Sequence, residues 1–243
     1  MTTSPRPQVL LLPGLLCDEW VWRAQADALA QLADVTIADF SDHDDLTEMA
    51  QASLALVDGQ TTVDVVGHSM GGRVALEIWR IAPRRVRSLV LLDTGVHGVQ
   101  SGEAESRQVL LDLSATRGMS ALADAWLPPM VGADRRTDAA LMDGLRAMVM
   151  RATPRQHRRQ IHALLTRPDA TSLLATITVP TLVVVGRHDE WSPVAQHEEI
   201  AAAIASARLE IIEDVGHMTT VEQPDAISAL LDGWLKDPRV RAV

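Results

Sequence analysis

Ser69 stands in a short segment whose residue types and spacing suit a nucleophile. Residues 67–72 read Gly-His-Ser-Met-Gly-Gly, after an apolar run at residues 63–66 and before a stretch with apolar residues at helical spacing. A strand, a tight turn with one serine and a helix make a nucleophile elbow. Such a turn strains the serine backbone and needs small residues two positions away on either side, where Gly67 and Gly71 stand. The hydroxyl is then presented at a helix N-terminus, whose dipole favours a developing negative charge.

Two later residues have the chemistry to activate that hydroxyl. Asp189 follows the strand-like residues 181–185, and His217 follows the strand-like residues 208–213. A histidine can accept the serine proton, and a carboxylate can fix the imidazole tautomer and stabilise its charged form. Together the three residues indicate acyl-transfer chemistry through a covalent intermediate.

The order Ser, Asp, His, each at the end of a strand, resembles that of the α/β-hydrolase superfamily. The resemblance extends through the whole chain and implies an α/β fold with a mostly parallel, doubly wound sheet. It also implies a helical cap inserted after the strand that the family counts as its sixth. Strand signals stop between residues 95 and 175, so we predict a cap of residues 95–175 and a core of residues 1–94 and 176–243. The expected strands lie at residues 9–12, 35–38, 63–66, 88–93, 181–185 and 208–213.

Asp93 is an alternative to Asp189 as the acid. It ends the strand at residues 88–93, and a minority of α/β-hydrolases take their acid from this position. Asp189 is favoured because its surroundings match the family's Gly-x-x-Asp-x-x-x-Pro pattern. The proline of that pattern, Pro193, is expected at the first position of a helix that Ser192 caps.

The resemblance also implies an oxyanion hole made of two backbone amides. The family's loop after the first strand usually reads His-Gly-x, and the residue after the glycine donates its N–H. Here Pro13 replaces the histidine, and Leu15 falls at the donor position. A backbone N–H does not depend on the preceding side chain, so we expect the donor to be retained. The second donor would be the amide of Met70, directly after the serine.

Three residues are candidates for substrate contacts: Trp20, Arg158 and Trp191. Trp20 and its neighbour Trp22 lie near the presumed pocket, and one of them is expected to be core packing. Residues 144–168 contain six arginines and no acidic residue, in a chain that is acidic overall. On a helical wheel, Arg158 lies on the shoulder of an apolar face, where it could pair with a substrate carboxylate. Alternatively, these arginines form a solvated face or bind acidic surface of the same protein.

Length and charge restrict the other possibilities. With 243 residues, the chain can bury one sizeable α/β core plus an insertion, and its net charge of −10 argues against a nucleic-acid or anionic-membrane partner. The single cysteine, Cys17, excludes an internal disulfide. The apolar residues 9–14 are too short for a signal sequence or a membrane span, so we expect a cytoplasmic protein. The acidic residues 39–45 are interpreted as a solvated loop, and no metal or cofactor is expected.

The resemblance implies a serine hydrolase that cleaves a small carboxylic ester or lactone. Residues 213–224 are particularly similar to the 3-oxoadipate enol-lactonase-like branch. The same fold and triad also serve carboxylesterases, hydrolases of carbon–carbon bonds in aromatic breakdown products, and perhydrolases, and some members are receptors for small molecules with slow turnover. The sequence therefore predicts a small-molecule ligand without identifying it, and it predicts no oligomeric state.

Overall fold

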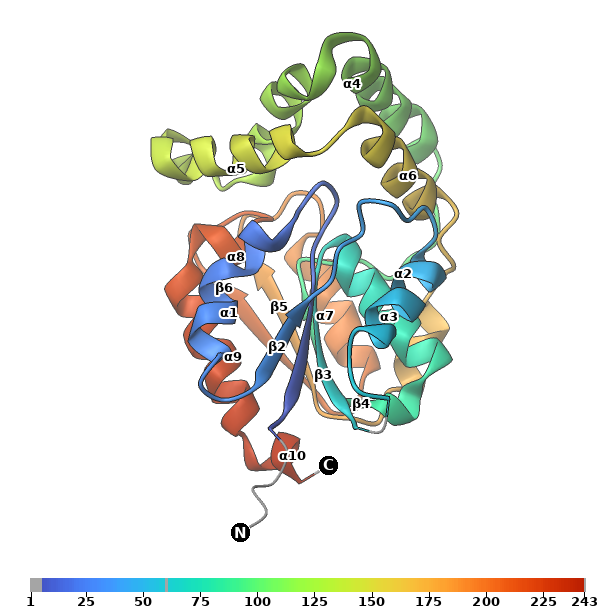
Figure 1. Cartoon of the computed structure of the whole chain (residues 1–243), viewed down its shortest axis with the longest axis vertical. Helices are drawn as coiled ribbons and strands as arrows, with labels where there is room; N and C mark the ends of the chain where they lie inside the picture. Colours follow the sequence, from blue (N-terminus) through green and yellow to red (C-terminus); the bar gives the residue numbers. More distant parts are fainter. Residues whose placement is uncertain (1–5, 60, 243) are drawn as a thin grey trace.

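A six-stranded sheet forms the centre of the protein in the computed structural model, which describes residues 6–59 and 61–242. Its strand order is β2-β1-β3-β4-β5-β6, and every neighbouring pair is parallel (Figure 1). The strands are β1 (Gln8–Leu12), β2 (Asp34–Ile37), β3 (Val63–His68), β4 (Val86–Leu92), β5 (Thr181–Gly186) and β6 (Ala207–Ile212). The six expected strands are confirmed to within a few residues at each end. The inner strands are almost wholly buried, as parallel strands covered on both faces should be, whereas the edge strands β2 and β6 are partly exposed.

Helices cover both faces of the sheet, so the doubly wound architecture is also confirmed. Figure 1 shows α1 packed with α9 on one side of the sheet and α2 packed with α3 on the other. A further helix, α7, contacts β5 and β6. The bounds of these and two short helices are α1 (Arg23–Leu29), α2 (Leu46–Ala55), α3 (Met70–Ile81), α7 (Val194–Ala203), α8 (Thr219–Glu222), α9 (Pro224–Lys236) and α10 (Pro238–Arg241).

One predicted helix start is wrong. Pro193 is the N-cap of α7 and not its first helical residue, because its ψ of 161° is extended, and α7 begins at Val194. Ser192 therefore does not cap the helix, and its backbone N–H instead donates to the carboxylate of Asp189.

Three long helices lie together at one end of the sheet and form what we call the helical roof: α4 (Glu103–Trp126), α5 (Ala139–Arg151) and α6 (Pro154–Leu165) (Figure 1). The roof follows the fourth of this chain's six strands. Side chains cap the second and third helices at their N-termini, where Asp138 accepts from the N–H of Leu141 and Thr153 accepts from that of Gln156. The assignment of residues 95–175 to a separate cap stays a prediction.

The two segments that connect the roof to the sheet lie side by side. The N–H of Ala170, after α6, donates to the carbonyl of Val96, before α4, over 2.8 Å. The N–H of Gly98 donates to Asp169 Oδ2, also over 2.8 Å. Arg167 adds a third link by donating to the carbonyl of Gly98. The chain thus enters and leaves the roof at one place.

None of the helices in residues 6–59 and 61–242 combines the length and the apolar character that a membrane crossing needs.

Candidate active site

Ser69 lies in the turn between β3 and α3 with φ 55° and ψ −116°. This strained backbone is the one that the elbow motif predicts. A Cβ atom at Gly67 would lie 2.3 Å from the carbonyl oxygen of Gly71, and one at Gly71 would lie 2.1 Å from that of Leu12. Only glycine therefore fits at either position. The hydroxyl of Thr94 donates to the carbonyl of Ser69 over 2.7 Å and supports the turn from the loop after β4.

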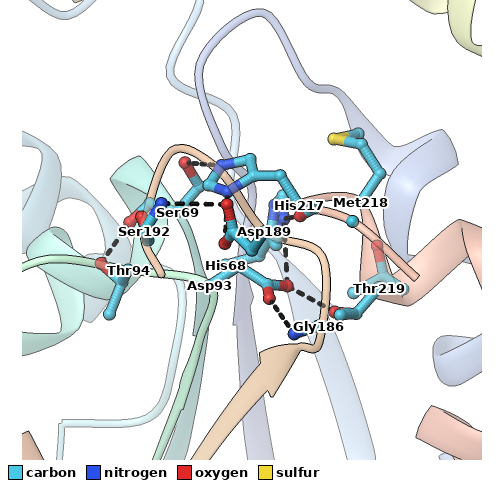
Figure 2. A network of polar contacts seen from close by, with 12 residues as sticks. His68, Ser69, Asp93, Thr94, Gly186, Asp189, Ser192, His217, Met218 and Thr219 are labelled. Carbon is cyan, nitrogen blue, oxygen red and sulfur yellow. Dashed lines mark hydrogen bonds and ion pairs between the residues drawn. The ribbon is translucent and has the colours of Figure 1, made fainter. Parts of the chain in front are cut away.

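A continuous chain of hydrogen bonds runs from Ser69 to His217 and on to Asp189 (Figure 2). Ser69 Oγ lies 2.8 Å from His217 Nε2, and His217 Nδ1 lies 2.8 Å from Asp189 Oδ2. The second carboxylate oxygen of Asp189 accepts from the N–H groups of Trp191 (2.8 Å) and Ser192 (2.9 Å). The structure thus brings together the three residues that the sequence singles out.

The electrostatics of this group stabilise a charged histidine beside an ionised carboxylate. Burial acts to lower the pKa of His217, but the charge and hydrogen bond of Asp189 outweigh it and raise that pKa above the ordinary value. Burial likewise opposes ionisation of Asp189, yet His217 and two backbone N–H donors lower its pKa below the ordinary value. Each partner therefore favours the charged form of the other.

Asp93 is a second buried carboxylate beside this group, but it does not hydrogen-bond to His217. Its oxygens accept from the N–H of Gly186 over 3.0 Å and from the hydroxyl of Thr219. Burial and the nearby charge of Asp189 raise the pKa of Asp93 well above its usual range. The pKa of Asp93 is therefore raised and that of Asp189 is lowered, and Asp189 is the carboxylate that pairs with the histidine.

His68, next to the serine, holds the loop that carries His217. Its Nε2–H donates to the carbonyl oxygen of His217 over 2.8 Å (Figure 2). Burial, reinforced by the neighbouring His217, lowers the pKa of His68 to about 4, so the ring stays neutral at pH 7. Local sequence patterns cannot reveal this contact, because its two residues lie 149 positions apart.

Glu222 is a further residue that sequence reasoning missed. It is buried, and its carboxylate accepts from the backbone N–H groups of Gly132, Gly216 and Met218 at 2.9 to 3.1 Å. It thereby connects the segment after α4 to both sides of His217. Only its place in the 213–224 stretch could have drawn attention to it.

We expect Glu222→Ala to lower the free energy of unfolding by about 3 kcal/mol, because it leaves three buried N–H groups without an acceptor. The measurement is a denaturant titration followed by circular dichroism. Glu199→Ala is the matched control, since Glu199 lies on the exposed side of α7. A loss in Glu222→Ala no larger than that of the control would contradict the role we give to this carboxylate.

A cavity of about 560 Å³ opens beside Ser69. Leu15 and Met70 line it from the sheet side, and Trp126, Ile161 and Leu164 line it from the roof. In the part of the chain that the structure describes, the N–H groups of Leu15 and Met70 donate to no protein acceptor. The expected oxyanion donors are therefore both available at the cavity.

Of the three residues predicted to contact substrate, only Trp191 lines this cavity. Trp20 packs on α5, where a Cβ at Gly144 would lie 2.5 Å from its ring, and it borders a separate depression on the surface. Arg158 is exposed and lies outside the cavity. The helical wheel places Arg158 wrongly because it takes only apolar residues as the inward face of α6. The buried face also includes the polar residue Gln160, and it points away from Arg158.

The buried side chain of Gln160 hydrogen-bonds to the backbone of the loops after β1 and β2. Its side chain accepts from the N–H of Leu16 over 2.8 Å and donates to the carbonyl of Phe40 over 3.2 Å. The arginines that do line the cavity are Arg73, Arg107 and Arg167.

The acidic loop is a helix-capping loop, as expected. Asp45 accepts from the N–H groups of Thr47 and Glu48 at the start of α2, and Asp39 accepts from that of Ser41. In residues 6–59 and 61–242, no group of three or more His, Cys, Asp or Glu side chains is arranged to hold a metal ion.

Known proteins resemble the chain in sequence and in structure. A family model described as "Alpha/beta hydrolase family" matches residues 9–230. The putative carbamate hydrolase RutD of Cronobacter turicensis is 28% identical over 242 residues, which cover 93% of this chain and 89% of that protein. A thermophilic esterase from Thermogutta terrifontis, solved with malate bound, superposes with a TM-score of 0.89 and 26% identity over 96% of this chain and 91% of that one. The enol-lactonase from Burkholderia xenovorans LB400 has a TM-score of 0.87 and 25% identity, over 98% of this chain and 94% of that one.

Proposed function

The chain belongs to the α/β-hydrolase family, and on this premise we propose that it is a serine hydrolase that cleaves a small carboxylic ester or lactone. The observation that carries the proposal is the hydrogen-bonded chain from Ser69 Oγ through His217 to Asp189 beside a cavity. The likeness to an esterase and to an enol-lactonase over nearly the whole chain supports the choice of substrate bond.

In the first half of the reaction, Ser69 Oγ attacks the carbonyl carbon of the substrate. His217 Nε2 takes the hydroxyl proton, and Asp189 stabilises the imidazolium that forms. The negative charge on the former carbonyl oxygen is held by the N–H groups of Leu15 and Met70. When the tetrahedral intermediate collapses, the proton passes from His217 to the leaving alkoxide, and an acyl-enzyme remains.

In the second half, water replaces the alcohol. His217 removes a proton from the water as its oxygen attacks the acyl carbon, and the same proton returns to Ser69 Oγ when the ester bond to the enzyme breaks. The product is a carboxylic acid. For a lactone, the alcohol and the acid are two ends of one molecule, so a single hydroxy acid leaves.

The pKa of His217 predicts the acid limb of the pH profile. A base that must be neutral loses activity as the pH falls through its pKa, and Asp189 raises the pKa of His217 above the ordinary 6.5. We therefore expect kcat/KM to fall to half its plateau at a pH above 6.5. The measurement is kcat/KM for a neutral ester across the pH range, since this ratio reports the free enzyme. A limb centred below 6.5 would contradict the assignment of His217.

The proposed function is tested with a panel of p-nitrophenyl esters and small lactones, run beside active-site titration with a serine-reactive phosphonate. We expect stoichiometric labelling and turnover of short-chain esters or lactones. A receptor of the same fold would turn over every ester very slowly and would change the binding of a partner instead. Turnover below that of free imidazole for the whole panel would overturn the proposal.

A further inference from the structure

Three arginines and one acidic residue meet at the cavity. Arg167 binds Glu103 through both ends of its guanidinium, with Nη1 2.7 Å from Oε1 and Nη2 2.6 Å from Oε2. Arg107 binds the same carboxylate, with Nε 2.8 Å from Oε1. One carboxylate thus hydrogen-bonds to two arginines, whereas the third, Arg73, makes no hydrogen bond to it.

Arg73 has no carboxylate partner among the described residues. Its Nη1 donates to the carbonyl of His97 over 2.9 Å, and its Nε and Nη2 have no acceptor in the part of the chain that the structure describes. The guanidinium lies against the loop after β4, because a Cβ at Gly95 would be 2.8 Å from Nη2. Burial and the nearby charge of Arg167 lower the pKa of Arg73, as expected for a cation without a paired anion.

Arg73 lies close to Ser69 in the chain and lines the same cavity. Arg73 lies in the first turn of α3, four residues after Ser69, which is the N-cap of that helix. Both residues line the cavity. A substrate whose carbonyl carbon lies at Ser69 can therefore place a second group against the guanidinium of Arg73.

We propose that Arg73 binds a free carboxylate of the substrate, so that the preferred substrates are half-esters or lactones of short dicarboxylic acids. The proposal rests on the proposed function for the reacting end of the substrate. Ion pairs of arginine with carboxylate gain from two parallel hydrogen bonds, and Arg73 retains the free N–H groups for them. Glu103 already binds the guanidinium groups of Arg107 and Arg167. The cavity therefore offers an unpaired guanidinium to one substrate carboxylate and not to several.

The test compares matched pairs of esters. Monomethyl glutarate and monomethyl adipate are each compared with the methyl ester in which a carboxamide replaces the free carboxylate, and methanol release is followed. We expect the carboxylate to raise kcat/KM about 10- to 100-fold, the value of a charge-assisted hydrogen bond, and mainly through KM. Equal kcat/KM for both members of each pair would overturn the proposal.

Substitutions of individual arginines test which side chain binds the substrate carboxylate. Arg73→Gln should abolish the preference for the carboxylate while phosphonate still labels Ser69. Arg73→Lys should keep an intermediate preference, because lysine retains the positive charge but cannot donate two parallel hydrogen bonds. Arg155→Gln, on the exposed face of α6, is the matched control and should keep the full preference. Loss of the preference in Arg158→Ala, with retention in Arg73→Gln, would assign the carboxylate to the exposed arginine and overturn the proposal. Should Arg73→Gln not fold, a full preference in Arg73→Lys would overturn it equally.

A binding measurement separates this inference from the proposed function. In Ser69→Ala, calorimetric titration compares monomethyl glutarate with the methyl ester in which a carboxamide replaces the free carboxylate, and we expect tighter binding of monomethyl glutarate that disappears when Arg73→Gln is added. If no ester is hydrolysed but this Arg73-dependent binding is found, the proposed function fails and the carboxylate site stands. If esters are hydrolysed but monomethyl glutarate and its carboxamide analogue bind equally, the carboxylate site fails and the hydrolase stands.

Discussion

Ser69→Ala is expected to lower kcat by about 10⁶-fold and to abolish labelling by a serine-reactive phosphonate, by analogy with loss of the nucleophile in known serine hydrolases. The physical reason is that Ser69 Oγ lies 2.8 Å from His217 Nε2, and no other hydroxyl within residues 6–59 and 61–242 is hydrogen-bonded to that ring. The measurement is single-turnover and steady-state hydrolysis of the best ester of the panel, together with mass spectrometry of the labelled protein.

The control for this variant is Ser101→Ala, because Ser101 lines the same cavity and has no contact with the histidine. Its activity should stay within a few-fold of wild type. Circular dichroism should show that Ser69→Ala is folded, since only one hydroxyl is removed. A Ser69→Ala protein that retains a tenth of the wild-type activity would disprove the nucleophile assignment.

Asp189→Asn should lower kcat by about 10⁴-fold, as amidation of a triad aspartate does elsewhere. An asparagine can donate to His217 Nδ1 and so favours the tautomer that carries its proton on Nε2, where the serine proton must go. The change should also move the acid limb of the pH profile to lower pH, since Asp189 raises the pKa of His217. Both effects are read from one set of kcat/KM measurements across the pH range.

Asp93→Asn is the matched control for that substitution. Asp93 is equally buried, but its oxygens accept from Gly186 and Thr219, and an asparagine can still accept from one of them. We expect its kcat within about tenfold of wild type, the effect of a single hydrogen bond. A larger loss in Asp93→Asn than in Asp189→Asn would move the acid to the end of β4.

Local patterns in the sequence account for what could be predicted. The elbow around Ser69 needs only glycines at fixed offsets, and the inner strands are short, mostly apolar runs. The order of Ser69, Asp189 and His217 then places each at a strand end. These features depend on neighbours in sequence, so the resemblance was sufficient to find the fold and to select the three residues that the structure brings together.

Substrate contacts depend on tertiary packing, which local patterns do not contain. A helical wheel gives the relative angles of residues on α6 but not which side faces the cavity, and buried Gln160 decided that against Arg158. No local pattern singles out Arg73, because an arginine on a helix is ordinarily solvated. Its lack of a carboxylate partner among the described residues depends on Glu103, 30 residues later, which hydrogen-bonds to Arg107 and Arg167.

The roof joins the rest of the chain through two segments that lie side by side. Val96 and Ala170 are joined by one hydrogen bond, although 73 residues lie between them. Ser69, Asp189 and His217 all lie outside this interval, whereas Arg107 and Trp126 lie within it. Recombination at the two crossing points would exchange the walls of the cavity as one cassette and leave the serine, histidine and aspartate in place. The part of the cavity wall that the roof supplies can therefore evolve on a separate stretch of the gene, whereas Arg73 on α3 stays with the catalytic residues.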